Sequence, residues 1–233
     1  MKKLFSVAAG VILVAAVLLY SNIAQPGTNE QTVANIPIEQ TNSNISTEQS
    51  DEDIPAVKPS VSPIRVTDQE GIVPGGTIKV EVERIVDGDT FRALYQGEQY
   101  KVRLLCIDTP ESVKENVQEQ PYGKKATERL KELIDGKNVQ MVFEKEVRDR
   151  YDRLLAYVLL EDGVCVNALM VSEGYARVNT VKPNTVHKDY FIGLMEEAIG
   201  EKIGLWSLRP EERPFVKNDK GNYVPRIYEE EAA

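Results

Sequence analysis

Cysteine and histidine are scarce in this sequence, which has two cysteines and one histidine in 233 residues. Two cysteines cannot make a disulfide-dense scaffold or a zinc site built mainly from cysteine. The single histidine, His187, excludes metal sites with several histidine ligands, and any Ser–His or Cys–His catalytic arrangement would have to use it. We expect Cys106 and Cys165 to be buried thiols, although a disulfide between them would be permitted if the protein is exported to an oxidising environment.

Basic residues are also fewer than acidic ones, with 28 Lys and Arg against 37 Asp and Glu, which gives a net charge of −9. Taken alone, this argues against a nucleic-acid partner, because proteins that bind phosphate backbones usually carry a basic surface. The average hides a local difference, however, since residues 77–209 hold 20 basic and 23 acidic residues. Most of the excess acid therefore lies in the flanks, and a nucleic-acid partner stays open.

One long apolar run spans residues 4–20 and follows Lys2 and Lys3. Basic residues before such a run are typical of a secretory signal. The run is also close to the shortest length that crosses a bilayer as a helix. We therefore expect a secreted or cell-surface protein, in which residues 1–24 are either a cleaved signal peptide or a membrane anchor.

Aromatic residues are absent from residues 25–76, where Asn, Thr, Ser, Gln and Pro dominate. Such a segment buries too little apolar area to offset the entropy of ordering it. We predict a flexible polar linker over 25–76 and a solvated acidic extension over 210–233. The folded domain is then expected within 77–209.

Hydrophobic periodicity is concentrated in that domain. Apolar residues alternate with charged ones over 78–83, which predicts a half-buried strand, and an Asp-Gly turn then leads to a second strand at 90–95. The same reasoning predicts strands at 100–107, 139–147 and 154–160, and helices at 122–134, 167–174 and 187–199. Five short strands with a helix between the third and fourth favour a small closed barrel with helices packed on it.

Three short segments carry clusters of charged residues: VDGDT at 86–90, VRLLCIDTPE at 102–111 and RDRYDR at 148–153. Each has an ordinary explanation, namely a hairpin turn, a surface ion pair of Arg103 and a solvated loop. Together they supply carboxylates for a hard cation, a further carboxylate, and arginines whose planar groups match phosphate oxygens. Metal-assisted hydrolysis of a phosphodiester requires this combination.

Several motifs in order resemble the staphylococcal nuclease (thermonuclease) family: IVDGDT at 85–90, RLLCIDTPE at 103–111, YG at 122–123, YDRLLAYV at 151–158 and GLWS at 204–207. The likeness covers about residues 77–208. It implies an α+β fold, namely a five-stranded OB-fold β-barrel with three packed helices. It further implies Ca²⁺-dependent cleavage of DNA and RNA by water attack on phosphorus, with 3′-phosphate products. We expect one Ca²⁺ ion, a preference for single strands and a monomeric protein.

The resemblance also implies a metal site. Asp89 and Asp108 match the side-chain calcium ligands of the family, and the backbone carbonyl of Thr109 matches a further ligand. Asp87 matches a carboxylate that lies beside the ion without binding it directly. Two carboxylates and a carbonyl would leave coordination positions for water and for a phosphate oxygen.

The implied catalytic residues are Glu111, Arg103 and Arg153. Glu111 matches the family's general base or water-orienting carboxylate. Arg103 and Arg153 match the arginines that hold the scissile phosphate and stabilise its developing charge, and Tyr151 matches a phosphate-binding tyrosine.

The sequence departs from the family pattern in two places. The segment VNTVKPN at 178–184 is one residue shorter than usual and lacks the two tyrosines that pack on nucleotide and base. Stacking contributes about 1–3 kcal/mol per base, so substrate affinity and base preference are the properties affected. Asp152 stands where a glycine is usual, either as a turn residue or as a charge that lowers the local positive potential.

Two other readings stay open. A nucleic-acid-binding OB module that no longer cleaves is the main alternative, because OB barrels commonly bind single strands without catalysis. A cell-surface protein with a structural Ca²⁺ is the other, but such a site has no use for phosphate-binding arginines. The complete set of site residues favours the enzyme.

Overall fold

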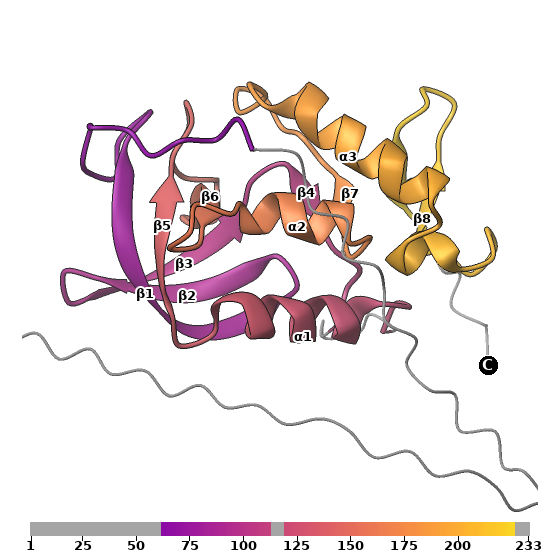
Figure 1. The fold of residues 1–233 in the computed structure, drawn as a ribbon, viewed down its shortest axis with the longest axis horizontal. Helices are drawn as coiled ribbons and strands as arrows, with labels where there is room; N and C mark the ends of the chain where they lie inside the picture. Colours follow the sequence, from indigo (N-terminus) through magenta and orange to yellow (C-terminus); the bar gives the residue numbers. More distant parts are fainter. Residues whose placement is uncertain (1–61, 113–118, 227–233) are drawn as a thin grey trace, which may run out of the picture. The chain divides into compact units, whose positions relative to one another are not determined.

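A closed five-stranded barrel is the centre of the fold in the computed structural model, which describes residues 62–112 and 119–226 (Figure 1). Its strands are β1 (Thr77–Asp87), β2 (Thr90–Tyr95), β3 (Glu98–Leu104), β5 (Asn138–Val142) and β6 (Leu154–Leu159), arranged in the order β1-β2-β3-β6-β5. Neighbouring strands are antiparallel except β3 and β6, which are parallel. The predicted five-stranded OB-fold barrel is confirmed.

The barrel strands follow the hydrophobic pattern that predicted them. In β1, Ile78, Val80 and Val82 are buried while the residues between them are exposed. The turn after β1 pairs Asp87 with Thr90, as the Asp-Gly signal predicts. Strand β5 stops at Val142, short of the predicted 147, so the chain leaves the barrel earlier than its apolar run indicates.

Three helices cover the barrel: α1 (Gly123–Ile134), α2 (Val166–Ser172) and α3 (Lys188–Gly200). Ala126, Leu130 and Ile134 of α1 are fully buried, and their spacing places them on one face, packed on β1. Helix α2 contacts α1, β6 and α3. A short 3₁₀ helix, η1 (Gly204–Ser207), buries Trp206 completely.

The predicted strand at 100–107 is interrupted. Strand β3 ends at Leu104, Cys106 has φ of 63°, and the chain then forms the two-residue strand β4 (Ile107–Asp108). Strand β4 pairs with β7 (Arg177–Val178) outside the barrel, with Asp108 opposite Arg177. The interruption therefore places Asp108 in a short strand opposite β7, a partner strand that the sequence pattern did not predict.

The folded domain begins earlier than residue 77, which corrects the predicted linker over 25–76. Ile64 is only 2% exposed, the Thr67 N–H donates to Thr77 Oγ1 at 3.0 Å, and the Gly75 N–H donates to the Glu144 carbonyl at 2.8 Å. Residues 62–76 thus pack along the barrel. Within 62–76, Ile64 is the buried hydrophobic side chain that holds the segment on the domain. One such residue hardly changes the average composition of 25–76, so the composition predicted a linker.

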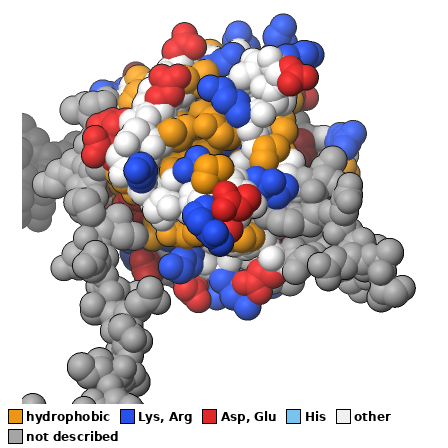
Figure 2. All heavy atoms as spheres, turned by 90° about the vertical axis from the view of Figure 1, so that its right-hand side faces the viewer, with side chains coloured by type: hydrophobic (Ala, Val, Ile, Leu, Met, Phe, Trp, Pro, Cys, Tyr) orange, Lys and Arg blue, Asp and Glu red, His pale blue; other side chains and the backbone are white. Residues whose placement is uncertain are grey.

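The predicted solvated extension over 210–233 is likewise wrong for residues 210–226. They form an antiparallel hairpin of β8 (Phe215–Lys217) and β9 (Tyr223–Pro225). Phe215 is 2% exposed, and the Tyr223 ring lies 4.8 Å from the Trp206 ring in an edge contact. Figure 2 shows the face at the right of Figure 1, on which hydrophobic side chains gather among charged ones.

The predicted signal or anchor over 1–24 lies outside the described residues, as do 25–61 and 227–233. Across 62–112 and 119–226, the helices are too short or too polar to cross a membrane. Cys106 and Cys165 are both buried and unbridged, so the prediction of free thiols is confirmed.

Candidate active site

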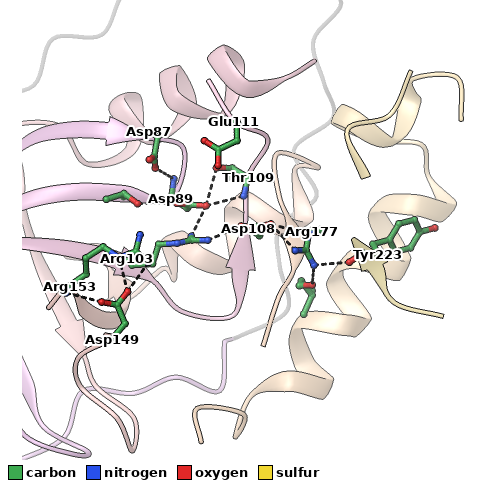
Figure 3. A network of polar contacts seen from close by, with 12 residues as sticks. Asp87, Asp89, Arg103, Asp108, Thr109, Glu111, Asp149, Arg153, Arg177 and Tyr223 are labelled. Atoms are coloured by element: carbon green, nitrogen blue, oxygen red, sulfur yellow. Dashed lines mark hydrogen bonds and ion pairs between the residues drawn. The ribbon is translucent and has the colours of Figure 1, made fainter. Parts of the chain in front are cut away.

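Arg103 on β3 joins two of the predicted metal ligands (Figure 3). Its Nη1 lies 2.5 Å from Asp89 Oδ2, and its Nη2 donates to Asp108 Oδ1 at 2.8 Å. Asp89 lies in the β1–β2 turn and Asp108 in β4, so the barrel and the interrupted third strand bring the two carboxylates together. The three side chains are mostly buried, which strengthens both ion pairs.

Asp89 also holds Thr109, the residue whose carbonyl is an expected metal ligand. Asp89 Oδ2 accepts hydrogen bonds from the Thr109 backbone N–H at 3.0 Å and from Thr109 Oγ1 at 3.1 Å. Glycine at position 88 is required for this arrangement, because a Cβ there would lie 2.7 Å from Thr109 Oγ1. The turn and the start of the loop after β4 therefore pack directly together.

Asp87 lies at the end of β1, next to this group. Its Oδ1 accepts the backbone N–H of Asp89 at 3.1 Å. Burial, and next the negative charge of Asp89, raise the pKa of Asp87 to about 7. Two carboxylates are thus crowded at the turn, an arrangement that a cation would relieve.

Arg177 is a site residue that the sequence reasoning missed. Its Nε donates to Asp108 Oδ2 at 3.0 Å, and its Nη2 lies 2.8 Å from the same oxygen. Burial raises the pKa of Asp108, and the charges of Arg177 and Arg103 act in the opposite direction. One feature of the sequence could have identified Arg177: it stands between apolar Ala176 and Val178, just as Arg103 stands among apolar residues.

Glu111 lies in the loop that leads from β4 to α1, and Figure 3 shows it beside Thr109. Its backbone N–H donates to Gln120 Oε1 at 3.0 Å, and its carbonyl accepts the Gln120 N–H at 3.0 Å. A Cβ at position 123 would lie 2.4 Å from the Glu111 carbonyl oxygen, so Gly123 permits the close approach of α1. The backbone of Glu111 is thereby fixed against the start of a helix.

Arg153 lies on the other side of Arg103, immediately before β6, and is held by Asp149. Arg153 Nε donates to Asp149 Oδ2 at 2.7 Å, and Asp149 Oδ1 accepts the backbone N–H groups of Tyr151 and Arg153 at 2.9 and 3.0 Å. Although burial opposes it, these hydrogen bonds lower the pKa of Asp149. Tyr151 is 65% exposed, and the Arg150 and Arg153 guanidinium groups lie 4.8 and 5.6 Å from its ring centre.

A hollow of about 450 Å³ is lined by Arg103, Tyr151 and Arg153 together with the segment 179–184. Val181, at its edge, is 67% exposed in the segment that lacks the family's tyrosines. Asp152 has φ of 61°, which accounts for the usual glycine there, and its carboxylate pairs with Arg148 at 2.8 Å. Asp152 is thus a turn residue whose charge is already balanced.

The oxygen donors at this site suit Ca²⁺ in kind, because carboxylates and carbonyls are the ligands that hard cations prefer. Asp89, Asp108 and the Thr109 carbonyl are the donors of the expected set. Among residues 62–112 and 119–226, no three His, Cys, Asp or Glu side chains form a metal-binding group. The expected set supplies two carboxylates and one carbonyl, and water and substrate would fill the remaining positions.

Comparisons with known proteins agree with this geometry. Residues 101–208 match the family described as "Staphylococcal nuclease homologue". Endonuclease YncB of Bacillus subtilis is 43% identical over 132 residues, which are 56% of this chain and 62% of the relative. The SPbeta prophage-derived endonuclease YokF of the same organism is 46% identical over 132 residues, which are 56% of this chain and 44% of the relative.

The chain thus spans less than two thirds of these two Bacillus proteins. It covers more of the thermonuclease of Staphylococcus intermedius, with 36% identity over 125 residues that make up 54% of this chain and 74% of the relative. With the closed barrel, its three helices and the ordered motifs, this chain belongs to the staphylococcal nuclease family.

Proposed function

We propose that the protein is a Ca²⁺-dependent nuclease that hydrolyses phosphodiester bonds of DNA and RNA. The observation that carries this proposal is the position of Arg103. It bridges Asp89 and Asp108 on one side, and on the other it lines a hollow together with Arg153. An acidic, cation-compatible group thus meets an arginine pair suited to a phosphodiester.

The proposed mechanism assigns one task to each group. Bound Ca²⁺, held by Asp89, Asp108 and the Thr109 carbonyl, would neutralise phosphate charge and make water more acidic. Arg103 and Arg153 donate hydrogen bonds to the non-bridging phosphate oxygens, and these bonds strengthen as negative charge develops. Glu111 accepts a proton from the attacking water. The water oxygen bonds to phosphorus as the bond to the 5′ oxygen breaks, the leaving 5′ oxygen takes a proton from solvent water, and the phosphate remains on the 3′ end.

Substrate binding would depend on phosphate contacts more than on stacking. Tyr151 is an exposed aromatic ring at the hollow, while the 178–184 segment offers exposed Val181 where the family carries tyrosine. Losing such stacking costs about 1–3 kcal/mol per base. We propose single-stranded nucleic acid as the preferred substrate, because exposed bases can reach this open hollow.

Location and assembly are proposals from the sequence alone. Lys2 and Lys3 followed by the apolar run at 4–20 support export, with attachment to the membrane if the segment is retained. We also propose that the protein acts as a monomer.

The test is incubation of the purified full-length protein with end-labelled single-stranded DNA and RNA, in Ca²⁺ and in a chelator. We expect cleavage in Ca²⁺, loss of cleavage in the chelator, and products that carry a 3′-phosphate. Binding of the same oligonucleotides without cleavage under both conditions would instead support the non-catalytic OB module.

A further inference from the structure

We propose that Arg177 is a positioning residue for the active site, and that the C-terminal hairpin β8–β9 holds it in place. The inference rests on the proposed function, because it concerns the orientation of the expected calcium ligand Asp108. It adds a residue and an element that the motifs do not include. The hairpin lies beyond residues 101–208, where the match to the family ends.

Arg177 is 8% exposed and has no role in the reaction proposed above. Two of its nitrogens face Asp108 Oδ2, at 3.0 Å from Nε and 2.8 Å from Nη2. The third nitrogen, Nη1, donates to the Tyr223 backbone carbonyl at 2.6 Å. The guanidinium group therefore connects β4 to β9 across a large sequence separation.

The hairpin leaves Arg177 little freedom to move. Its guanidinium carbon lies 5.2 Å from the centre of the buried Phe215 ring, and Tyr223 packs against Trp206 at 4.8 Å. Figure 3 shows Arg177 between Asp108 and Tyr223. An arginine fixed by an aromatic ring on one face and a carbonyl at its tip can hold a carboxylate in a single orientation.

The orientation of Asp108 matters for the rest of the site. Arg177 occupies Oδ2, so Oδ1 is the oxygen that faces Arg103 at 2.8 Å, and Arg103 in turn contacts Asp89. Ion pairs thus run from the hairpin through Asp108 to the arginine that would hold the phosphate. Misplacing a reacting group by about 1 Å can lower a rate by about 100-fold, so a rotated Asp108 would affect catalysis.

The test compares full-length Arg177→Met with Arg177→Lys, measuring both Ca²⁺ affinity by titration calorimetry and steady-state kinetics. We expect Arg177→Met to bind Ca²⁺ several-fold more weakly and to lose about tenfold or more in kcat, with a smaller change in KM. Arg177→Lys keeps a cation at Asp108 and is expected to recover part of both losses.

Arg129→Met is the matched control. Arg129 on α1 makes a similar two-bond ion pair with Glu173, at 2.6 and 2.9 Å, and neither residue has a role in the proposed reaction. Removing it is expected to lower the melting temperature while leaving Ca²⁺ affinity and kcat unchanged. If Arg129→Met lost as much Ca²⁺ affinity and kcat as Arg177→Met, the effect of Arg177 would be one of general stability, and the inference would be overturned.

Phe215→Ala tests the hairpin without changing the site. We expect it to shift Ca²⁺ affinity and kcat in the same direction as Arg177→Met, by a smaller factor. Unchanged or tighter Ca²⁺ binding with unchanged kcat in Arg177→Met would overturn the inference. If wild type neither binds Ca²⁺ nor cleaves, the proposed function fails instead, so the two failures are distinguishable.

Discussion

Gly88 is a residue at which the site leaves little room for a side chain. A Cβ at this position would lie 2.7 Å from Thr109 Oγ1 and 2.8 Å from the Ala126 side chain, both of which are buried. The turn that carries Asp87 and Asp89 therefore packs against the loop after β4 and against α1. Substitution here affects the stability of the fold and the geometry of the expected metal site together.

We predict that Gly88→Ala lowers the free energy of unfolding by about 1–3 kcal/mol, because the added methyl group overpacks a closed contact. Urea denaturation of wild type and variant measures this change in the free energy of unfolding. The control is Gly193→Ala, an exposed position in α3 where an added Cβ meets no atom within 4 Å. That variant is expected to gain up to about 1 kcal/mol from helix propensity. Equal effects of the two substitutions would contradict the packing argument.

The two buried thiols are the other residue-scale feature with a measurable consequence. Cys106 Sγ lies 3.1 Å from the Tyr157 hydroxyl. Burial raises the pKa of Cys106 to about 11 and the pKa of Cys165 to about 12. The thiolate, which is the reactive form, is therefore scarce at physiological pH.

We predict that neither thiol reacts appreciably with a disulfide reagent at pH 8 while the protein is folded, and that both react once it is denatured. A spectrophotometric thiol titration with and without denaturant checks this. Rapid labelling of either cysteine in the folded protein would mean that the site of that thiol opens to solvent.

At the scale of elements, the segment 62–76 before β1 extends the folded domain. Ile64 enters the core at 2% exposure, whereas its neighbour Val66 is 47% exposed. The two residues are close in sequence and similar in chemistry, so they form a matched pair for a test of packing.

We predict that Ile64→Ala lowers the free energy of unfolding by about 2–5 kcal/mol, the usual cost of a cavity left by a buried isoleucine. Val66→Ala is expected to change it by less than about 0.5 kcal/mol. Thermal or urea denaturation of the full-length chain compares them. A small effect in both would show that 62–76 does not contribute to the stability of the domain.

The barrel could be predicted because its strands carry strict apolar alternation and clear turn signals, as in β1 and the Asp-Gly turn at 87–88. Helix α1 could be predicted because its apolar residues fall on one face. The ordered motifs then indicated the residues of the site. In these parts of the chain, local pattern and tertiary structure agree.

The C-terminal hairpin and the role of Arg177 could not be predicted in this way. Phe215 and Tyr223 are isolated aromatics in a charged segment with no periodic pattern. Tyr223 packs on Trp206, and the Phe215 ring lies against the Arg177 guanidinium group. Arg177 pairs with Asp108 across 69 positions of sequence. Contacts of this kind depend on how elements pack and leave little trace in a local pattern.

At the scale of the whole molecule, the net charge of −9 does not describe the site. Arg103 and Arg153 line one hollow, and their acidic partners Asp89, Asp108 and Asp149 are held in fixed ion pairs. The lining of the hollow nevertheless holds three arginines, Arg103, Arg150 and Arg153, against the carboxylates Glu146 and Asp149. A phosphodiester there would meet net positive charge, and a bound cation would offset Asp89 and Asp108. An acidic chain can therefore carry a site for an anionic substrate.

The central claim is that this hollow, with the acidic group beside it, cleaves phosphodiesters. The most direct measurement is the rate of single-stranded DNA cleavage in Ca²⁺ by wild type, Arg153→Met and the control Arg129→Met. We predict that Arg153→Met loses about 100-fold or more, the usual cost of one charge-stabilising donor, while Arg129→Met cleaves at the wild-type rate. A near-wild-type rate for folded Arg153→Met would contradict the account.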